Sequence, residues 1–242
     1  MANYQLIVPH VLKNEGDLSD DPRDVGAAKN PSPIKNPKTG RYYHTNKGVI
    51  WATWVGYSKK KGIPLDAQRW YRMSQSDWLD IMKTLFWDGV YADKINSQAI
   101  AEILFEAIWG GTVKPLIVYL QTYLRKEGAT NDKGQQIAVD GAMGRNTYEA
   151  LNKFTKNNKQ HAKLIEDLTA YRLSQLKKMP AWNYAQNGWT RRLFEIRDAG
   201  LKYITENPIK TGGAVVGLLL LGAGAYFLLP SLSKGGFTKV VG

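Results

Sequence analysis

The feature that most constrains the fold is an apolar run without any charged residue, at residues 212–229. The run reads GGAVVGLLLLGAGAYFLL, and as a helix it would reach roughly 27 Å, about the thickness of the hydrocarbon core of a bilayer. Its Gly and Ala residues are typical of membrane helices that pack closely against neighbours. We therefore expect a linker at 206–211, a transmembrane helix at 212–230 and a tail at 231–242. The alternative is a buried core helix.

The formal net charge of +12 is unevenly distributed along the chain. Residues 1–152 hold 19 Lys and Arg against 16 Asp and Glu, whereas residues 153–242 hold 14 against 5. A basic surface attracts polyanions. Because this one runs into an apolar segment, we expect a lipid bilayer as its partner and no nucleic acid. The alternative is a solvated basic surface without a partner.

The residue types also limit the possible cofactors. The chain has no cysteine, which excludes disulfides and thiolate metal sites. His10 and His161 belong to no metal-ligand pattern. We therefore expect neither a metal nor another cofactor.

Apolar residues recur at helical spacing through most of the remaining sequence. The helix-like stretches are 6–11, 53–57, 64–81, 99–108, 115–124, 147–154 and 161–179. Ser74 or Ser76 can cap the helix that carries Trp78. Because strand-like alternation is scarce, the predicted fold class is mainly α, with one helical domain at 1–95 and a small helical module at 96–205.

A cluster of carboxylates follows the first helical pattern. Glu15 lies at the end of this pattern, and Asp17, Asp20, Asp21 and Asp24 lie in the polar stretch that follows. Hydrolysis of a glycosidic bond needs a proton donor in poorly solvated surroundings, and it often uses a second carboxylate that stays ionised. A Glu at a helix end and Asp residues on a polar loop can supply these two environments. The alternatives are a solvated acidic loop and a calcium-binding loop.

The same stretch resembles the opening of the family-108 glycoside hydrolases, the N-acetylmuramidases of phages and bacteria. Their pattern is E-G-G-Y, then D-P-x-D-x-G-G-x-T-N-x-G, and the matching stretches here are Glu15-Gly16, 21–27 and, after an insertion, 45–49. The resemblance implies that residues 1–95 form a lysozyme-like catalytic domain in which Glu15 is the general acid. It leaves the second carboxylate open, and we take Asp24 as the first candidate, ahead of Asp17 and Asp20.

Further stretches extend the resemblance over about residues 5–200. They are 86–88, 104–111, 139–147 and 187–192. The stretch 139–147 resembles the V-D-G-x-x-G-x-x-T mark of a peptidoglycan-binding module that usually follows this catalytic domain. The alternative is a plain joint between a loop and a helix capped by Asn146 or Thr147. The positions that depart from the family pattern are Asp17, Leu18, Ala27, Trp51, Glu106 and Trp109.

Polar and aromatic residues within or near these motifs are the expected contacts with the substrate. They are Asp17, Asp20, Tyr43, Asn46, Trp51 and Glu106. Flat aromatic rings can stack on the faces of sugars. Trp51 and Trp54 also fall at helical spacing, so a place in the core is the alternative for both.

The resemblance implies an enzyme that hydrolyses bacterial peptidoglycan between N-acetylmuramic acid and N-acetylglucosamine. The start of the chain has neither a basic region nor a long apolar run, so we expect no signal peptide. The expected localisation is a membrane crossed by a single C-terminal span. A phage virion membrane, with other virion membrane proteins as partners, is favoured over the inner membrane of the host. The enzyme would then act in phage infection or host lysis.

Two other functions stay open. One is a non-catalytic virion or membrane protein that binds the cell wall. The other is a lytic transglycosylase, which also uses a single Glu but makes an anhydro product.

Overall fold

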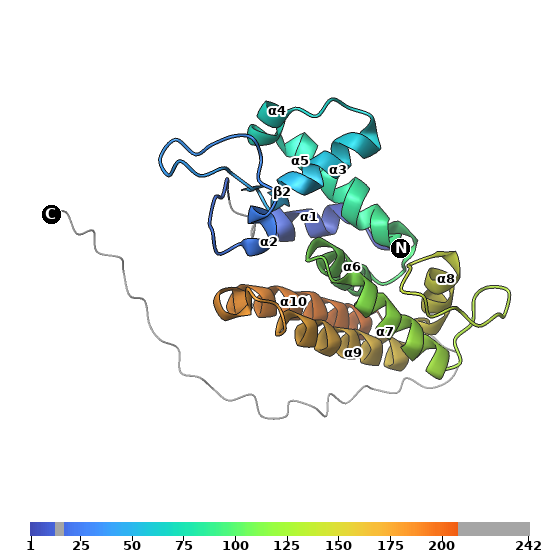
Figure 1. Ribbon diagram of the computed structural model, residues 1–242. Coiled ribbons are helices and arrows are strands. Elements are labelled where there is room, and N and C mark those ends of the chain that lie inside the picture. Colours follow the sequence, from blue (N-terminus) through green and yellow to red (C-terminus); the bar gives the residue numbers. More distant parts are fainter. Residues whose placement is uncertain (13–16, 208–242) are drawn as a thin grey trace, which may run out of the picture.

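The computed structural model describes residues 1–12 and 17–207, and this part of the chain is mainly helical, as predicted. Along the chain lie α1 (Tyr4–Leu12), α2 (Val25–Ala28), β1 (Thr45–Asn46), β2 (Val49–Ile50), α3 (Trp51–Lys61), α4 (Ala67–Tyr71), α5 (Gln75–Ile81), the π-helical turn η1 (Met82–Trp87), the 3-10 turns η2 (Asp88–Val90) and η3 (Ala92–Lys94), α6 (Gln98–Trp109), α7 (Val113–Lys126), α8 (Arg145–Phe154), α9 (Asn158–Leu176) and α10 (Trp182–Glu206). The two short strands pair antiparallel. Figure 1 shows α1 to α5 above α6, with α9 and α10 side by side below it.

Side-chain caps explain where two of the central helices begin. The hydroxyl of Ser74 accepts a hydrogen bond from the backbone N–H of Asp77 at 3.0 Å, which starts α5. Ser97 does the same for Ile100 at 3.3 Å, which starts α6. An N-cap of this kind stabilises a helix by about 1 kcal/mol. Capping of the Trp78 helix by Ser74 was one of the two predicted options.

The helix α8 begins differently from the prediction. Its N-cap is Gly144, which offers no side-chain acceptor, and the helix starts at Arg145. Asn146 and Thr147 therefore lie inside the first turn, and the prediction that one of them caps the helix is wrong.

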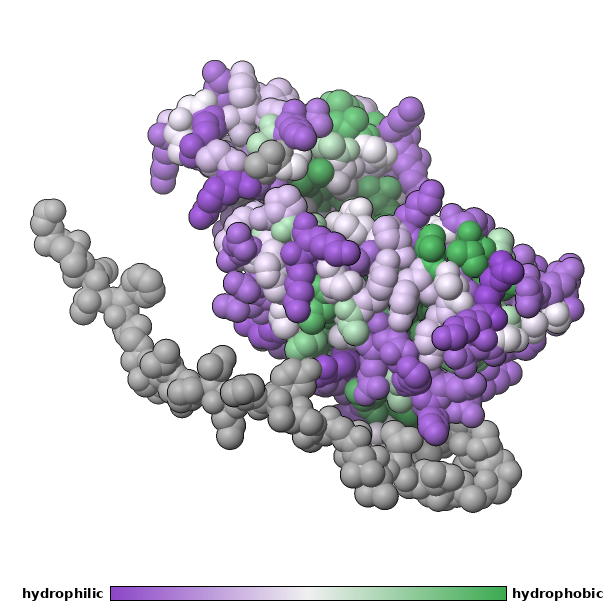
Figure 2. Space-filling model, turned by 60° about the horizontal axis from the view of Figure 1, so that its bottom comes forward, coloured by the Kyte–Doolittle hydropathy of each residue, from purple (hydrophilic) through white to green (hydrophobic). Residues whose placement is uncertain are grey.

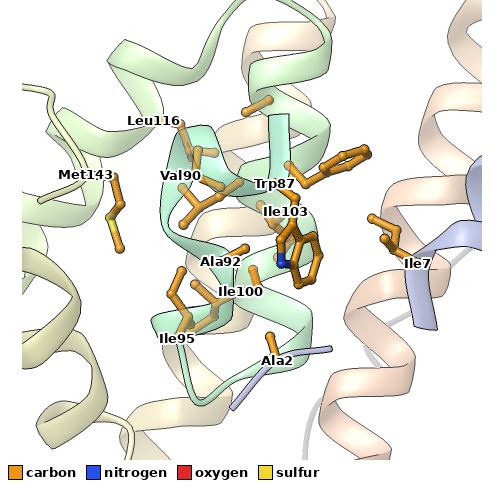
Figure 3. Close-up of a cluster of buried hydrophobic side chains, with 14 of the residues drawn as sticks. Ala2, Ile7, Trp87, Val90, Ala92, Ile95, Ile100, Ile103, Leu116 and Met143 are labelled. Carbon is orange, nitrogen blue, oxygen red and sulfur yellow. The ribbon is translucent and has the colours of Figure 1, made fainter. Parts of the chain in front are cut away.

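The buried apolar core extends on both sides of α6. Trp87 is fully buried, and its ring lies 5.7 Å from that of Tyr4 and 6.2 Å from that of Phe105. Figure 3 shows Trp87 between Ile7 of α1 and the α6 residues Ile100 and Ile103. The core therefore joins the N-terminal helix to α6.

The helix α10 is the longest described element, and no sequence pattern predicted it. Its apolar residues Leu193, Ile196 and Ile204 are buried. At Gly200, an added Cβ would lie 2.4 Å from the Cβ of Ala99, so only a glycine lets α10 approach α6 this closely. Figure 2 looks towards the side on which α9 and α10 lie, and that face is mainly hydrophilic. α10 is therefore amphipathic, with its apolar side packed on α6 and α9.

The helix α6 packs against η1, η2 and η3 before it in sequence and against α7, α9 and α10 after it. The predicted boundary between a domain at 1–95 and a module at 96–205 falls just before this helix. The boundary stays a prediction.

The expected membrane localisation is corrected by the helices themselves. Within residues 1–12 and 17–207, no helix is long and apolar enough to cross a bilayer. This finding contradicts the predicted single span in a virion or host membrane, and it removes the basis for expecting a bilayer and virion membrane proteins as partners. Residues 212–230, on which the prediction rested, lie outside the described residues.

Candidate active site

A cavity of about 500 Å³ lies where the start of α2 meets the C-terminal ends of α6 and α9 and the N-terminal half of α10. Its lining residues are Asp24, Glu106, Trp109, Gly110, Arg172, Leu176, Met179, Tyr184, Ala185, Gly188, Trp189, Arg192 and Leu193. Cavities that bind small molecules have this size and are mostly apolar, with a few polar groups that orient the ligand. The carboxylates of Asp24 and Glu106 and the rings of Trp109 and Trp189 give this cavity both kinds of group.

Asp24, the predicted second carboxylate, lines the cavity from the N-cap position of α2. One of its carboxylate oxygens accepts a hydrogen bond from the backbone N–H of Ala27 at 3.3 Å. This bond fixes the side chain at the start of the helix. The predicted general acid, Glu15, lies outside the described residues.

The neighbouring residue Arg23 links the acidic stretch to α10. Its guanidinium pairs with Asp21 at 2.5 Å and lies 5.8 Å from the centre of the Tyr184 ring. Because Arg23 hydrogen-bonds to the Asp21 carboxylate, the pKa of that carboxyl is lowered to about 2. Asp21 is therefore ionised at neutral pH.

Asp20 and Asp17 lie outside the residues that line the cavity. Asp20 accepts hydrogen bonds from the Thr39 hydroxyl and from the Asn36 amide at 3.1 Å, and it pairs with Arg41 at 3.5 Å. These bonds, led by that of Thr39, lower the pKa of Asp20. The carboxylate is thus occupied in holding the stretch 36–41. Asp17 is exposed.

Tyr43, Asn46 and Trp51, three of the predicted substrate contacts, lie in or beside the β1–β2 hairpin. They pack against α4 and do not line the cavity. Asn46 is buried, and its amide donates to the carbonyls of Trp70 at 2.6 Å and Tyr71 at 3.1 Å. The Trp51 ring meets that of Trp70 edge-on at 5.5 Å, and the Tyr43 ring lies 5.7 Å from that of Tyr71. For Trp51, this packing agrees with the alternative of a place in the core. Burial also raises the pKa of Tyr43.

Glu106 and two arginines form the charged floor of the cavity. The Glu106 carboxylate lies 3.1 Å from Arg192 Nε, and both side chains are about nine-tenths buried. Arg172 Nη2 donates to the Glu106 carbonyl at 3.0 Å, and Nη1 donates to the Thr112 hydroxyl. Burial lowers the pKa of Arg172 to about 10, so it is charged at neutral pH. The Glu106 carboxylate therefore balances buried positive charge that α9 and α10 bring to α6.

Comparison with known proteins indicates the class of enzyme. The family model described as glycosyl hydrolase 108 matches residues 8–111, which include Glu15, Asp24 and Glu106. The chain is a glycoside hydrolase that acts on peptidoglycan. The solved structure of SagA from Brucella abortus is similar in fold, with 20% identity and a TM-score of 0.55, over 83% of this chain and 94% of that chain. No curated protein matches the chain.

The sequence patterns assigned no function to the α10 residues that line the cavity. Trp189 and Arg192 fall in the stretch 187–192 that carries the resemblance, but no function was predicted for them. The signal that could have found them is spacing, because Tyr184, Gly188 and Arg192 are four residues apart and so share one face of a helix.

The motif at 139–147 is held by one buried side chain of α7. The Gln121 amide donates to Asp140 at 2.9 Å, to the Ala142 carbonyl at 3.0 Å and to Thr147 at 3.1 Å. The Gln121 side-chain oxygen accepts from the backbone N–H of Asp140 and Gly141. The polar groups of the motif are therefore used to hold this loop and the start of α8 against α7. Binding of peptidoglycan by this module stays a prediction.

Among the residues that the structure describes, no group of three or more His, Cys, Asp or Glu side chains could hold a metal ion.

Proposed function

We propose that the hydrolase is an N-acetylmuramidase that cleaves the bond from N-acetylmuramic acid to N-acetylglucosamine. The observation that carries this proposal is the cavity, which combines two carboxylates with aromatic rings beside the acidic stretch of the matched segment. Aromatic rings offer flat apolar surfaces to sugar rings, and carboxylates supply the acid and the charge stabilisation that glycosidic cleavage requires.

Glu15 is the proposed general acid. It would protonate the leaving oxygen as the glycosidic bond breaks, and for this task its pKa must be raised by apolar surroundings. Asp24 is the proposed second carboxylate, because it lines the cavity whereas Asp17 and Asp20 do not. It would activate water or stabilise the positive charge that develops on the sugar. Retention or inversion depends on the distance between the two carboxyl groups.

Glu106 is the predicted substrate contact that we retain, since it lines the same cavity. Asp20 and Asn46 are proposed to hold the local structure, because their polar groups bind neighbouring side chains and carbonyls. A role in phage infection or host lysis is a further part of the proposal, since both processes require glycan strands to be cut.

The first prediction concerns the general acid. Glu15→Gln keeps the size of the side chain and removes the proton that it donates, so the rate of release of reducing sugar from purified peptidoglycan should fall roughly 100- to 10,000-fold. Glu127→Gln is the matched control, since Glu127 is exposed at the end of α7, and this variant should keep the parent rate. A Glu15→Gln enzyme with the parent rate would show that Glu15 is not the acid.

Mass spectrometry of the products from the parent enzyme separates the remaining functions. Reducing muramic acid ends indicate hydrolysis, and 1,6-anhydro ends indicate a lytic transglycosylase. Binding to peptidoglycan without any product would indicate a wall-binding protein.

A further inference from the structure

One face of α10 forms a continuous wall of the cavity. Tyr184, Gly188 and Arg192 follow one another at four-residue spacing along this face, and Trp189 lies beside them. All four residues lie outside the segment 8–111 that matches the glycosyl hydrolase model. The carboxylates and this wall therefore come from different parts of the chain.

Apolar packing and one ion pair hold the wall in place. Leu193 and Ile196 are buried, and Gly200 lets α10 approach Ala99 of α6. The Glu106–Arg192 pair then joins the two helices at the cavity floor. A wall fixed by packing can hold its side chains in a binding geometry before the ligand arrives, which reduces the entropic cost of binding.

The rings around the cavity are arranged so that sugars can reach them. Trp189 is only partly buried, and Tyr184 is 59% exposed. Trp109 faces the cavity from α6, and its ring is supported edge-on by that of Phe86 at 4.8 Å. Gly188, which also lines the cavity, borders open space, because an added Cβ there would have no atom within 4 Å.

We propose that α10 is one wall of the glycan-binding cleft, with Trp189 and Tyr184 as substrate-binding residues that stack on the N-acetyl sugars of the strand. This inference rests on the proposed muramidase function. It assigns glycan binding to a helix outside the matched catalytic segment. Removal of α10 would therefore leave the acid and the second carboxylate in the chain but take away the surface that holds the strand.

The first experiment fills the cleft without breaking a contact. Gly188→Leu places a side chain in the cavity, and on soluble glycan strands it should raise KM at least about tenfold. Its Tm should not fall, because glycine is unfavourable inside a helix. Gly56→Leu is the control, since Gly56 is an exposed helical glycine of α3 that also has no atom within 4 Å of an added Cβ. Parent kinetics for Gly188→Leu would overturn the proposal.

The second experiment removes the rings. Trp189→Ala should raise KM about tenfold with a smaller change in kcat, and Trp189→Phe should recover most of the loss because it restores a flat ring. Tyr184→Ala should raise KM as well. Tyr203→Ala is its control on the same helix, since Tyr203 is 64% exposed and does not line the cavity. Equal KM values for the Tyr184 and Tyr203 variants and for Trp189→Ala would contradict the proposal.

The failure of this inference can be told apart from the failure of the proposed function. Calorimetry with the disaccharide GlcNAc–MurNAc, which lacks the bond from N-acetylmuramic acid to N-acetylglucosamine, measures glycan binding without cleavage in every variant. Binding that is lost with Gly188→Leu supports the wall even if Glu15 proves not to be the acid. If Gly188→Leu leaves binding unchanged and Glu15→Gln inactivates the enzyme, the muramidase proposal stands and the glycan-binding role of α10 is wrong.

Discussion

The two sides of the cavity are built in opposite ways. On one side, the stretch that carries Asp20, Asp21 and Asp24 is held mainly by polar bonds within residues 19–45, and many of the side chains that make them are exposed. On the other side, α10 is held by burial of apolar residues and by an ion pair between Glu106 and Arg192, which are 86 positions apart and about nine-tenths buried. The acidic side therefore depends on short-range polar bonds, and the helical side depends on packing between distant segments.

This difference assigns different tasks to the two sides. Exposed polar bonds are individually weak, so the acidic stretch can adjust its carboxylates around a substrate at little cost. A packed helix cannot shift without losing buried surface, so it offers a fixed surface on which the strand can be placed. We therefore expect variants on the helical side to affect stability and variants on the acidic side to affect chemistry.

The largest expected effect comes from the ion pair at the floor of the cavity. Glu106→Gln keeps the shape of the side chain but removes the buried negative charge beside Arg192 and Arg172. Breaking a buried pair in this way costs about 3–5 kcal/mol, and urea denaturation should show this loss. Asp20→Asn is the matched variant on the acidic side. It removes a carboxylate that pairs with a half-exposed Arg41, and it should lower stability much less. If both variants lose the same free energy of unfolding, the two sides of the cavity do not differ in how they are held.

The same distinction explains which features the sequence could predict. Glu15 and Asp24 stand in a local motif, and the capping of the Trp78 helix by Ser74 depends on residues three positions apart. These features are visible in short windows. The spacing of Tyr184, Gly188 and Arg192 is visible in the same way. What the α10 face contacts is not, because Gly188 and Gly200 weaken the helical pattern and because both glycines matter through contacts or space at distant helices.

Asn46 and Trp51 illustrate the opposite case. Their position beside the motif suggested substrate contact, whereas α4 folds back onto the hairpin and takes up the Asn46 amide and the Trp51 ring. Spacing along the chain reveals neither the contact with α4 nor which residues line the cavity.

A second effect, also on the helical side, depends on pH. His161 of α9 is buried with a ring nitrogen 2.7 Å from the Ser97 hydroxyl, and burial lowers its pKa to about 4. Since the unfolded chain binds this proton near pH 6.5, the stability contributed by the neutral ring is complete above pH 6.5 and is lost as the pH falls towards 4. The loss amounts to roughly 3 kcal/mol.

Thermal unfolding between pH 7 and pH 4 measures this loss. His161→Gln can keep a hydrogen bond to Ser97 and does not titrate, so its stability should fall less over this range than that of the parent. If the two profiles run parallel, His161 is not the source of the acid sensitivity. Asp21 of the acidic stretch should add little over the same range, because its pKa of about 2 in the folded chain and its ordinary value of 3.8 both lie below pH 4.

The smallest expected change in stability separates the two tasks of Asp24. Asp24→Ala removes the N-cap of α2 and should cost about 1 kcal/mol, whereas Asn caps helices as well as Asp does, so Asp24→Asn should keep the parent stability. Both variants remove the negative charge from the cavity. If this charge assists cleavage, both should lower kcat to a similar extent, although only the alanine variant is less stable in urea. A fully active Asp24→Asn enzyme would reduce Asp24 to a cap. Glu106 would then be the remaining described carboxylate at the cavity. The charge that assists cleavage would in that case come from the packed helical side and not from the acidic stretch.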